Sequence, residues 1–369
     1  MGAALVNGTL AHCLDYDDLH FPSLAHLSAP TWAAVLALAP AAGTGERTMI
    51  DAFLAGFEIG ARLGANGVGK AVTGAGWHAT GVHGRLSAAI AAAVLLELDE
   101  TGIQHAIAVA ATQTSGLTTS FGTMAKPFHA GKAAADGVLA AELAASGFEG
   151  SPAILDDPRN LTSALVQDGS VTMRLTGLGE HWEIERNALK PYACCGLTHA
   201  PIDCARALFP RLGGQAVERV EVDVHPLATQ VANQREPHTP LAGKFSLSYC
   251  VSLGLHGHRA TATDFTGERL ADEALRDLER QVQLNAVDDL EPSAARMRVT
   301  LSGGGQLSSS VEASLGNPEN PMDWNDLEDK FMPLVTPHSG TQAAAQLFAA
   351  LENFDRAGAF ADVQQLALS

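Results

Sequence analysis

Long runs of small apolar residues with helical spacing fill the first half of the sequence, and residues 1–185 contain no stretch in which apolar and polar side chains alternate. Helical spacing of the apolar residues covers several segments: residues 3–14, 30–63, 86–98, 104–115 and 133–146. Small residues such as Ala52, Gly56 and Gly60 allow neighbouring helices to approach closely. This half of the chain is therefore expected to be helical.

The pattern changes after residue 185. Residues 217–224 alternate apolar and polar side chains as a half-buried strand does, and residues 296–301 and 306–314 flank three glycines as in a β-hairpin. A helix is expected at residues 271–284, and helices return from Trp324, with Asp323 or Asn325 as the N-cap. We expect a mainly α fold, with a large all-helical domain (residues 1–185 and 317–369) and an inserted, smaller α+β domain (residues 186–316).

Composition and charge restrict the class of protein. The 369 residues are 46% hydrophobic and only 17% charged, which is typical of a globular chain. Apolar runs such as residues 88–96 are too short to span a bilayer, and no signal-like segment opens the sequence. The net charge of −18 argues against nucleic acid or an anionic membrane as partner. A local lysine cluster can still bind an anion, because salt screens charges beyond about 8 Å.

The cysteines indicate the compartment and the cofactor class. Five cysteines without a Cys-x-x-Cys pair fit free thiols in a reducing cytoplasm rather than a disulfide framework. Adjacent Cys194 and Cys195 are a poor start for an iron–sulfur cluster. We therefore expect a metal-independent protein.

A first candidate site lies in Gly122–Lys132, where Lys126, His129 and Lys132 are spaced by three residues. Pro127 fits the first turn of a helix, so these side chains share roughly one face near its N-terminus. Cationic groups beside outward-pointing backbone N–H groups suit an anionic ligand. A solvated helix start explains the same spacing.

A second candidate site follows the first helix. The run Asp15-Tyr-Asp-Asp18 precedes His20 and His26. Negative charge is unfavourable at a helix C-terminus, so these carboxylates need a partner such as a buried lysine, or a function. A solvated loop with His20 on the surface and a divalent metal site are the alternatives.

A glycine-rich segment, residues 64–76, leads to His78 at the start of a helix. It has no Gly-Lys-Ser/Thr ending and no preceding strand, so nucleotide binding is not expected. His78 is either a helix cap or a site residue.

Taken together, several segments resemble the MmgE/PrpD family over nearly the whole chain, in the family's order. They are Asn7–Asp18, Gly76–Gly81, Gly122–Gly131, Lys190–Tyr192, Lys244–Cys250 and Gly316–Phe331. The resemblance implies a helical domain made from both chain ends, an inserted α+β lid, a homodimer and no cofactor. It also implies an active site between the helical domain and the lid.

The resemblance carries site residues over by motif. The expected catalytic residues are Asp15, His26, His78, Lys126, Lys190 and Tyr249. Lys126, His129 and Lys190 are expected to bind the substrate. For Tyr249, a core aromatic residue with a bonded hydroxyl is the alternative, and for His129 a packing or capping role.

Two departures from the family affect the substrate. Leu19 stands where the family commonly has threonine, and Leu27 where proline often follows the histidine. The sequence also begins where family members already have helices behind them, which suggests a shortened member or a start site set too late.

The resemblance implies a cofactor-independent lyase or isomerase that removes a proton next to a carboxylate of a small di- or tricarboxylate. A 2-methylcitrate dehydratase-like activity is the first expectation. The alternatives are a cis-aconitate decarboxylase-like or iminodisuccinate epimerase-like enzyme, or an impaired paralogue that only binds carboxylates. Which histidine is the base stays open.

Overall fold

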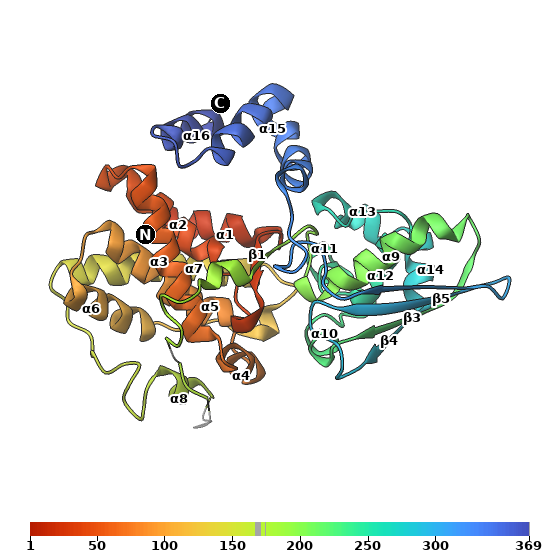
Figure 1. Ribbon diagram of the computed structural model, residues 1–369, viewed down its shortest axis with the longest axis horizontal. Coiled ribbons are helices and arrows are strands. Elements are labelled where there is room, and N and C mark those ends of the chain that lie inside the picture. The colour runs from red at the N-terminus through yellow and green to blue at the C-terminus, as the bar shows by residue number, and fades with distance from the viewer. Residues whose placement is uncertain (167–170, 174, 369) are drawn as a thin grey trace.

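The computed structural model describes residues 1–166, 171–173 and 175–368. Figure 1 shows the helices of the N-terminal half on one side and a sheet with its own helices on the other. The N-terminal helices are α1 (Gly2–Cys13), α2 (Ser28–Ala42), α3 (Glu46–Gly64), α4 (Val68–Gly74), α5 (Ala79–Leu95), α6 (Glu100–Ala111), α7 (Ala125–Ala145) and α8 (Leu161–Val166). The helices expected in this half are confirmed, and the glycine-rich segment additionally contains α4.

Helix α5 lies at the centre of this helical part and is buried almost along its entire length. Its alanine-rich surface packs against α2, α3, α6 and α7. Helices α1 and α7 cross at Gly8 and Gly131, where a Cβ on Gly131 would lie 2.1 Å from Thr9 Oγ1. The small residues of the sequence therefore set the short distance between helices, which brings the end of α1 to the start of α7.

The second part is α+β. Its elements are α9 (His199–Leu212), β3 (Val217–Val224), α10 (Pro226–Val231), α11 (Pro240–Gly243), α12 (Leu247–Leu255), α13 (Gly267–Leu270), α14 (Glu273–Arg280), β4 (Val282–Ala286), β5 (Ala295–Leu301) and β6 (Gln306–Val311). The strand order is β4-β3-β5-β6, with β3 parallel to β4 and antiparallel to β5. The inward side chains of β5, such as Met297 and Val299, join one apolar core with α9 and α12.

Strand β3 and the β5–β6 hairpin confirm the sequence patterns. The helix expected at residues 271–284 is partly wrong, because α14 ends at Arg280 and the next residues form β4. Val282 and Leu284 pair with β3 along the sheet. This pairing between distant segments overrides the local helical pattern.

A small sheet connects the two parts. Strand β1 (Asp18–His20) pairs antiparallel with β2 (Asn187–Leu189), and Asp18 lies opposite Leu189. Each strand has three residues, which is too short to show a period in the sequence. The pairing places Asp15, just before β1, beside Lys190, just after β2.

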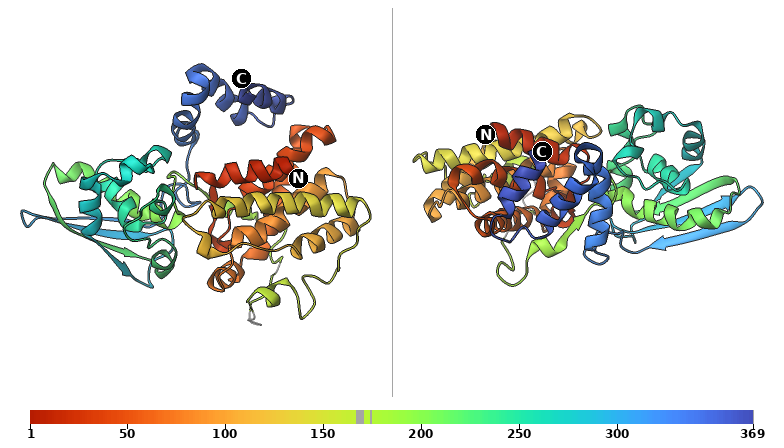
Figure 2. Two further views of the ribbon diagram at one scale, coloured as in Figure 1. Left: turned by 180° about the vertical axis from the view of Figure 1, so that it is seen from behind. Right: turned by 90° about the horizontal axis from the view of Figure 1, so that it is seen from above.

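The C-terminal helices α15 (Trp324–Glu352) and α16 (Ala359–Leu368) bring the chain back to the helical part, beside which both views of Figure 2 show them. Asp323 forms the expected N-cap of α15. Phe354 and Phe360 pack against the core around α2 and α3, and the Phe360 N–H donates to Glu46 Oε1 at 2.9 Å. The C-terminal helices thus contact the N-terminal helical core through these two phenylalanines, and the predominance of helices beside a small α+β region confirms the mainly α fold class.

None of the helices that the structure describes combines the length and the apolar character needed to cross a membrane.

Candidate active site

Asp15 lies between two lysines at the junction of the two parts. It follows the C-terminus of α1 with a left-handed backbone (φ 52°), a conformation that Asp tolerates better than most residues. Lys126 Nζ and Lys190 Nζ both donate to Asp15 Oδ1, the latter at 2.9 Å. Burial raises the pKa of the Asp15 carboxyl, but the two lysine charges outweigh burial and hold it well below its usual value. The carboxylate therefore stays ionised.

The two lysines come from different parts of the chain. Lys126 is in the first turn of α7, and its ammonium group also lies over the Phe245 ring, 5.1 Å from the centroid. Lys190 is 1% exposed and also donates to the Asp15 backbone oxygen at 3.1 Å. Burial lowers the pKa of Lys190, but the carboxylates of Asp15 and Asp17 raise it above its usual value. Lys190 therefore keeps its positive charge although it is buried.

A third lysine fixes the end of α1. Lys244 Nζ donates to the Leu14 backbone oxygen at 2.5 Å and to the Ala193 oxygen at 2.7 Å. A cation at a helix C-terminus is favourable, because the last carbonyl groups lack partners within the helix. Of the acids after α1, Asp15 thus has the buried lysine partners that the sequence argument called for, whereas Asp17 pairs with His12 and Asp18 accepts from Ser28 and Asn187.

His26 lies in the same cavity with Asp17 behind it. His26 Nδ1 is 3.5 Å from Asp17 Oδ1, and Asp17 Oδ2 accepts a hydrogen bond from His12 Nδ1 at 2.7 Å. Burial lowers the pKa of His26 to about 3, and the nearby Lys126 and Lys190 charges act in the same direction. The imidazole is neutral at physiological pH and can accept a proton.

His12 and Asp17 were missed as candidate residues. Both are buried or nearly so, and the His12 ring lies 4.5 Å from the His26 ring. Both residues lie within a motif on which the family resemblance rests. They were not chosen because a histidine near a helix end and one of three neighbouring acids are also common in a solvated loop. The signal available was the density of acids and histidines in residues 12–26.

His78 is paired with His129. His78 occupies the N-cap position of α5 without making a side-chain capping bond, and its Nδ1 lies 3.0 Å from His129 Nδ1. Mainly because of burial, the pKa values of both imidazoles lie below normal, that of His78 strongly. One ring must donate and the other accept, so a proton can pass between the cavity side and the more exposed His129.

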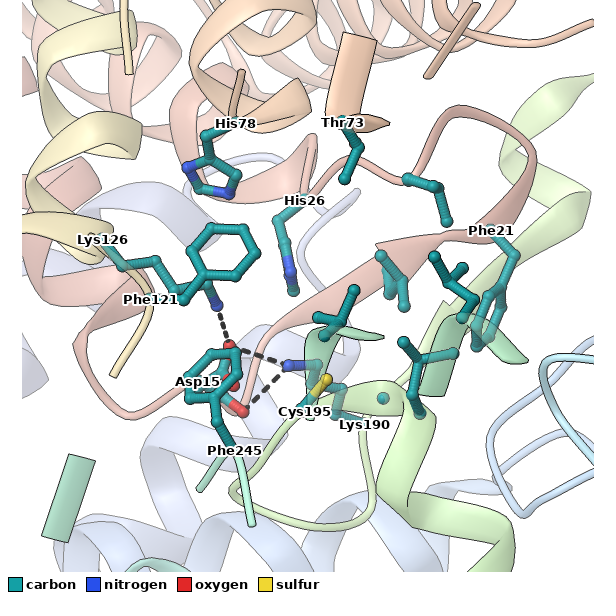
Figure 3. Close-up of a pocket in the computed structure, with 16 residues that line it drawn as sticks. Asp15, Phe21, His26, Thr73, His78, Phe121, Lys126, Lys190, Cys195 and Phe245 are labelled. Atoms are coloured by element: carbon teal, nitrogen blue, oxygen red, sulfur yellow. Dashed lines mark hydrogen bonds and ion pairs between the residues drawn. The ribbon is translucent and has the colours of Figure 1, made fainter. Parts of the chain in front are cut away.

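One cavity collects most of the expected residues. Its volume is about 60 Å³, and Asp15, His26, His78, Lys126 and Lys190 line one side of it (Figure 3). Leu19, the departure from the family's threonine, also lines this cavity.

The structure places three other residues of the sequence argument outside this cavity lining. His129 lies behind His78 rather than in the cavity lining. Tyr249 is fully buried, its hydroxyl donates to the Asp264 backbone oxygen at 3.0 Å, and it does not line the cavity. His20 is not on the surface as expected: its Nε2 lies 2.9 Å from Glu183 Oε2 inside the fold.

A metal at this site is opposed by charge. Within the described residues, His12, Asp15, Asp17 and His26 each have a potential ligand atom, all within 4.8 Å of one another. However, Asp15 already binds two ammonium groups, and Asp17 accepts from His12. A divalent cation would lie close to both lysines at a large electrostatic cost.

Comparisons with known proteins agree with the motifs. The MmgE/PrpD N-terminal domain matches residues 1–174, and the MmgE/PrpD C-terminal domain matches residues 192–356. The cis-aconitate decarboxylase of Aspergillus terreus is 27% identical over 365 residues, which cover 91% of this chain and 74% of the relative. The Mus musculus cis-aconitate decarboxylase is 26% identical over 356 residues (89% and 70%), and that of Homo sapiens 27% over 354 residues (89% and 71%).

Proposed function

The chain belongs to the MmgE/PrpD family, and we propose that it is a cofactor-independent lyase. It transfers protons at a carbon next to a carboxylate of a di- or tricarboxylate, and its relatives are likewise named as lyases that act on a carboxylate. The observation that carries the proposal is the position of Asp15 Oδ1 between Lys126 and Lys190, in a cavity that also contains His26 and His78.

Lys126 and Lys190 bind the substrate carboxylates in this proposal. Without substrate, both ammonium groups share one acceptor, Asp15 Oδ1, so each has N–H donors left for the oxygens of a substrate carboxylate. Charged hydrogen bonds contribute about 1.5–3 kcal/mol each, and more where charge develops in the transition state. Removal of a proton beside a carboxylate delocalises an electron pair onto that carboxylate, where both lysines stabilise it.

His26 is the proposed general base. Its Nδ1 faces Asp17, so Nε2 is the nitrogen left to take a proton from the substrate carbon. The Asp17 carboxylate, whose pKa the neighbouring histidines help to keep well below normal despite burial, then stabilises the imidazolium. His12 holds the other Asp17 oxygen and is a positioning residue.

His78 is the proposed second acid/base group. With His26 it would supply a proton to the leaving hydroxyl group in a dehydration, or to the carbon that loses carbon dioxide in a decarboxylation. His129 would exchange that proton with solvent through the 3.0 Å contact.

Decarboxylation of a cis-aconitate-like acid is the first candidate outcome, because the relatives carry that name at 26–27% identity. Dehydration of 2-methylcitrate is the second, since Leu19 gives the cavity an apolar contact for a methyl group. Epimerisation of iminodisuccinate, and binding without turnover, are outcomes of the test.

The test is incubation of the purified protein with cis-aconitate, 2-methylcitrate and iminodisuccinate in deuterated water, followed by NMR. Carbon dioxide loss, water loss or epimerisation identifies the reaction. Absence of turnover and of deuterium exchange with all three acids would overturn the lyase proposal in favour of a carboxylate-binding paralogue.

We also propose a homodimer in the cytoplasm. Val6, Leu10 and Leu14 are 55%, 62% and 38% exposed and recur every four residues, so they form an apolar stripe along α1 and its C-cap. All five cysteines are free thiols, which fits a reducing compartment. Light scattering of the native chain should give twice the monomer mass, and Leu10→Glu should shift it toward the monomer. A monomeric native chain would contradict the dimer.

A further inference from the structure

The cavity at Asp15 has two unlike sides. Every charged or imidazole group that lines it lies on the side of Asp15 and Lys126, and Figure 3 shows Phe21 at the opposite end. The remaining lining is mostly apolar: Leu19, Phe21, Leu24, Leu197, Leu227 and Val231. We call these six side chains the apolar wall.

The apolar wall is built by both parts of the fold. Leu19 is in β1, and Phe21 and Leu24 follow it. Leu197 is in a short 3-10 helix before α9, and Leu227 and Val231 are in α10. Several of these residues also pack against the apolar core of the α+β region. Core packing alone, however, does not require them to line a cavity that holds two ammonium groups.

A second, wider cavity of about 520 Å³ lies next to the first. The two cavities share Thr73, Phe121, Leu227 and Val231. The polar rim of the outer cavity includes Lys70, Thr118, Gln230 and Gln234. The shared side chains separate the lysine cavity from the outer cavity by no more than one layer of residues, so an elongated ligand that displaces them would reach from the lysines to the outer space.

The chemistry of the wall disfavours a fully polar ligand. A carboxylate placed against Leu19 or Leu24 loses hydration without gaining a hydrogen bond, which is costly. An alkyl group in the same place removes apolar surface from water on both sides, which is favourable.

We propose that the substrate is a di- or tricarboxylate that carries an unbranched alkyl substituent of several methylene groups. Its carboxylates bind Lys126 and Lys190, and its alkyl chain lies along the apolar wall toward the outer cavity. This inference rests on the proposed function of the same site and specifies its substrate class.

The experiment uses two synthetic series on the full chain: citrate with 2-alkyl substituents from methyl to hexyl, and cis-aconitate with the same substituents. The kcat/KM values are measured by NMR. Each buried methylene contributes a factor of about four, so kcat/KM should rise steeply with chain length until the chain reaches the outer rim. A flat or falling series, with the unsubstituted acid the best substrate, would overturn the inference while leaving the lyase proposal intact.

If no compound of either series reacts or exchanges deuterium, the lyase proposal fails, and calorimetric titration of the same compounds still tests the wall. Affinity that increases with alkyl length supports it, and affinity independent of length refutes it.

Two variants test whether the apolar wall causes the dependence of kcat/KM on alkyl length. Leu227→Asn should lower the ratio of hexyl to methyl kcat/KM at least tenfold, and Val231→Thr, which keeps the side-chain shape, should lower it by several-fold. Leu351→Asn, an equally simple change on the distant α15, should not alter the ratio. If Leu227→Asn and Val231→Thr reduce all substrates by the same factor, the wall is only structural.

Discussion

Lys190 and Asp15 are 175 positions apart in the sequence, yet Lys190 Nζ donates to both the side chain and the backbone oxygen of Asp15, at 2.9 and 3.1 Å. The contact exists because β1 pairs with β2 just beside it. It joins the helical part to the α+β part at the point where the cavity opens. The predictions below begin from this junction.

Replacing Lys126 by methionine should lower kcat/KM by about 10²–10³, because one of the two groups that stabilise the developing negative charge is lost. Asp15 keeps Lys190, so the melting temperature should change little. Lys132→Met is the matched control on the same helix, since that lysine pairs with Asp136 and its side chain is 44% exposed. A large loss of stability in Lys126→Met, with activity retained in the remaining folded protein, would make the lysine structural.

The lowered pKa values of buried histidines determine how the stability of the fold should depend on pH. Burial lowers the pKa of His83 to about 4 and that of His26 to about 3, from 6.5. The unfolded chain binds protons there before the folded chain does, so stability should fall as the pH decreases from 6.5 toward 4. Asp18 has the opposite effect on stability. Mainly burial raises its pKa to about 6, so the stability that its protonated carboxyl contributes is lost as the pH rises toward 6. The pKa values of His12, His20 and His78 are also lowered, mainly by burial, so the histidines outnumber Asp18 and the net effect is a loss of stability as the pH falls from 6 to 4. Urea unfolding at several pH values measures it.

His83→Leu isolates one of these groups. Both ring nitrogens of His83 are buried without a hydrogen-bond partner among the described residues. Leucine removes these unpaired groups, so the free energy of unfolding at pH 7 should rise by about 1–3 kcal/mol, and its dependence on pH should weaken. Urea unfolding at several pH values measures both. An unchanged pH dependence would show that His83 binds its proton equally well in both states.

His129→Asn should lower kcat about tenfold and leave KM nearly unchanged, because His129 contacts His78 rather than the cavity. Imidazole added to the buffer should restore part of the activity if the missing group carries a proton. His238→Asn, at an exposed position, is the control. A rise in KM without a change in kcat would instead support the substrate-binding role first expected for His129.

Gly131→Ala should destabilise the protein by about 1–3 kcal/mol and reduce activity. The new Cβ would lie 2.1 Å from Thr9 Oγ1 and 2.3 Å from the Leu5 oxygen, so α1 and α7 must separate. That movement changes the contact between Asp15 and Lys126. Gly267→Ala, with nothing within 4 Å of the added carbon, should have little effect on either property. Equal melting curves for both variants would contradict the tight crossing.

The sequence predicted those features that depend on local spacing. Apolar residues at helical intervals identified the helices, and alternation identified β3 and the β5–β6 hairpin. The cluster at Lys126 was identified because a helix start with basic residues is a local pattern. The need of the acids after α1 for a lysine also followed from the sequence, since charge at a helix end is a local property.

The tertiary structure decided which residues meet. Strand β4 exists because β3 is available to pair with it, and His20 is buried because Glu183, far along the chain, lies opposite its ring. His12 and Asp17 join His26 through contacts that no spacing predicts. Tyr249, in a matching motif, turns its hydroxyl toward Asp264 instead of the cavity. Periodicity in a sequence fixes which face of an element is apolar, whereas the identity of the atoms across that face depends on how distant elements pack.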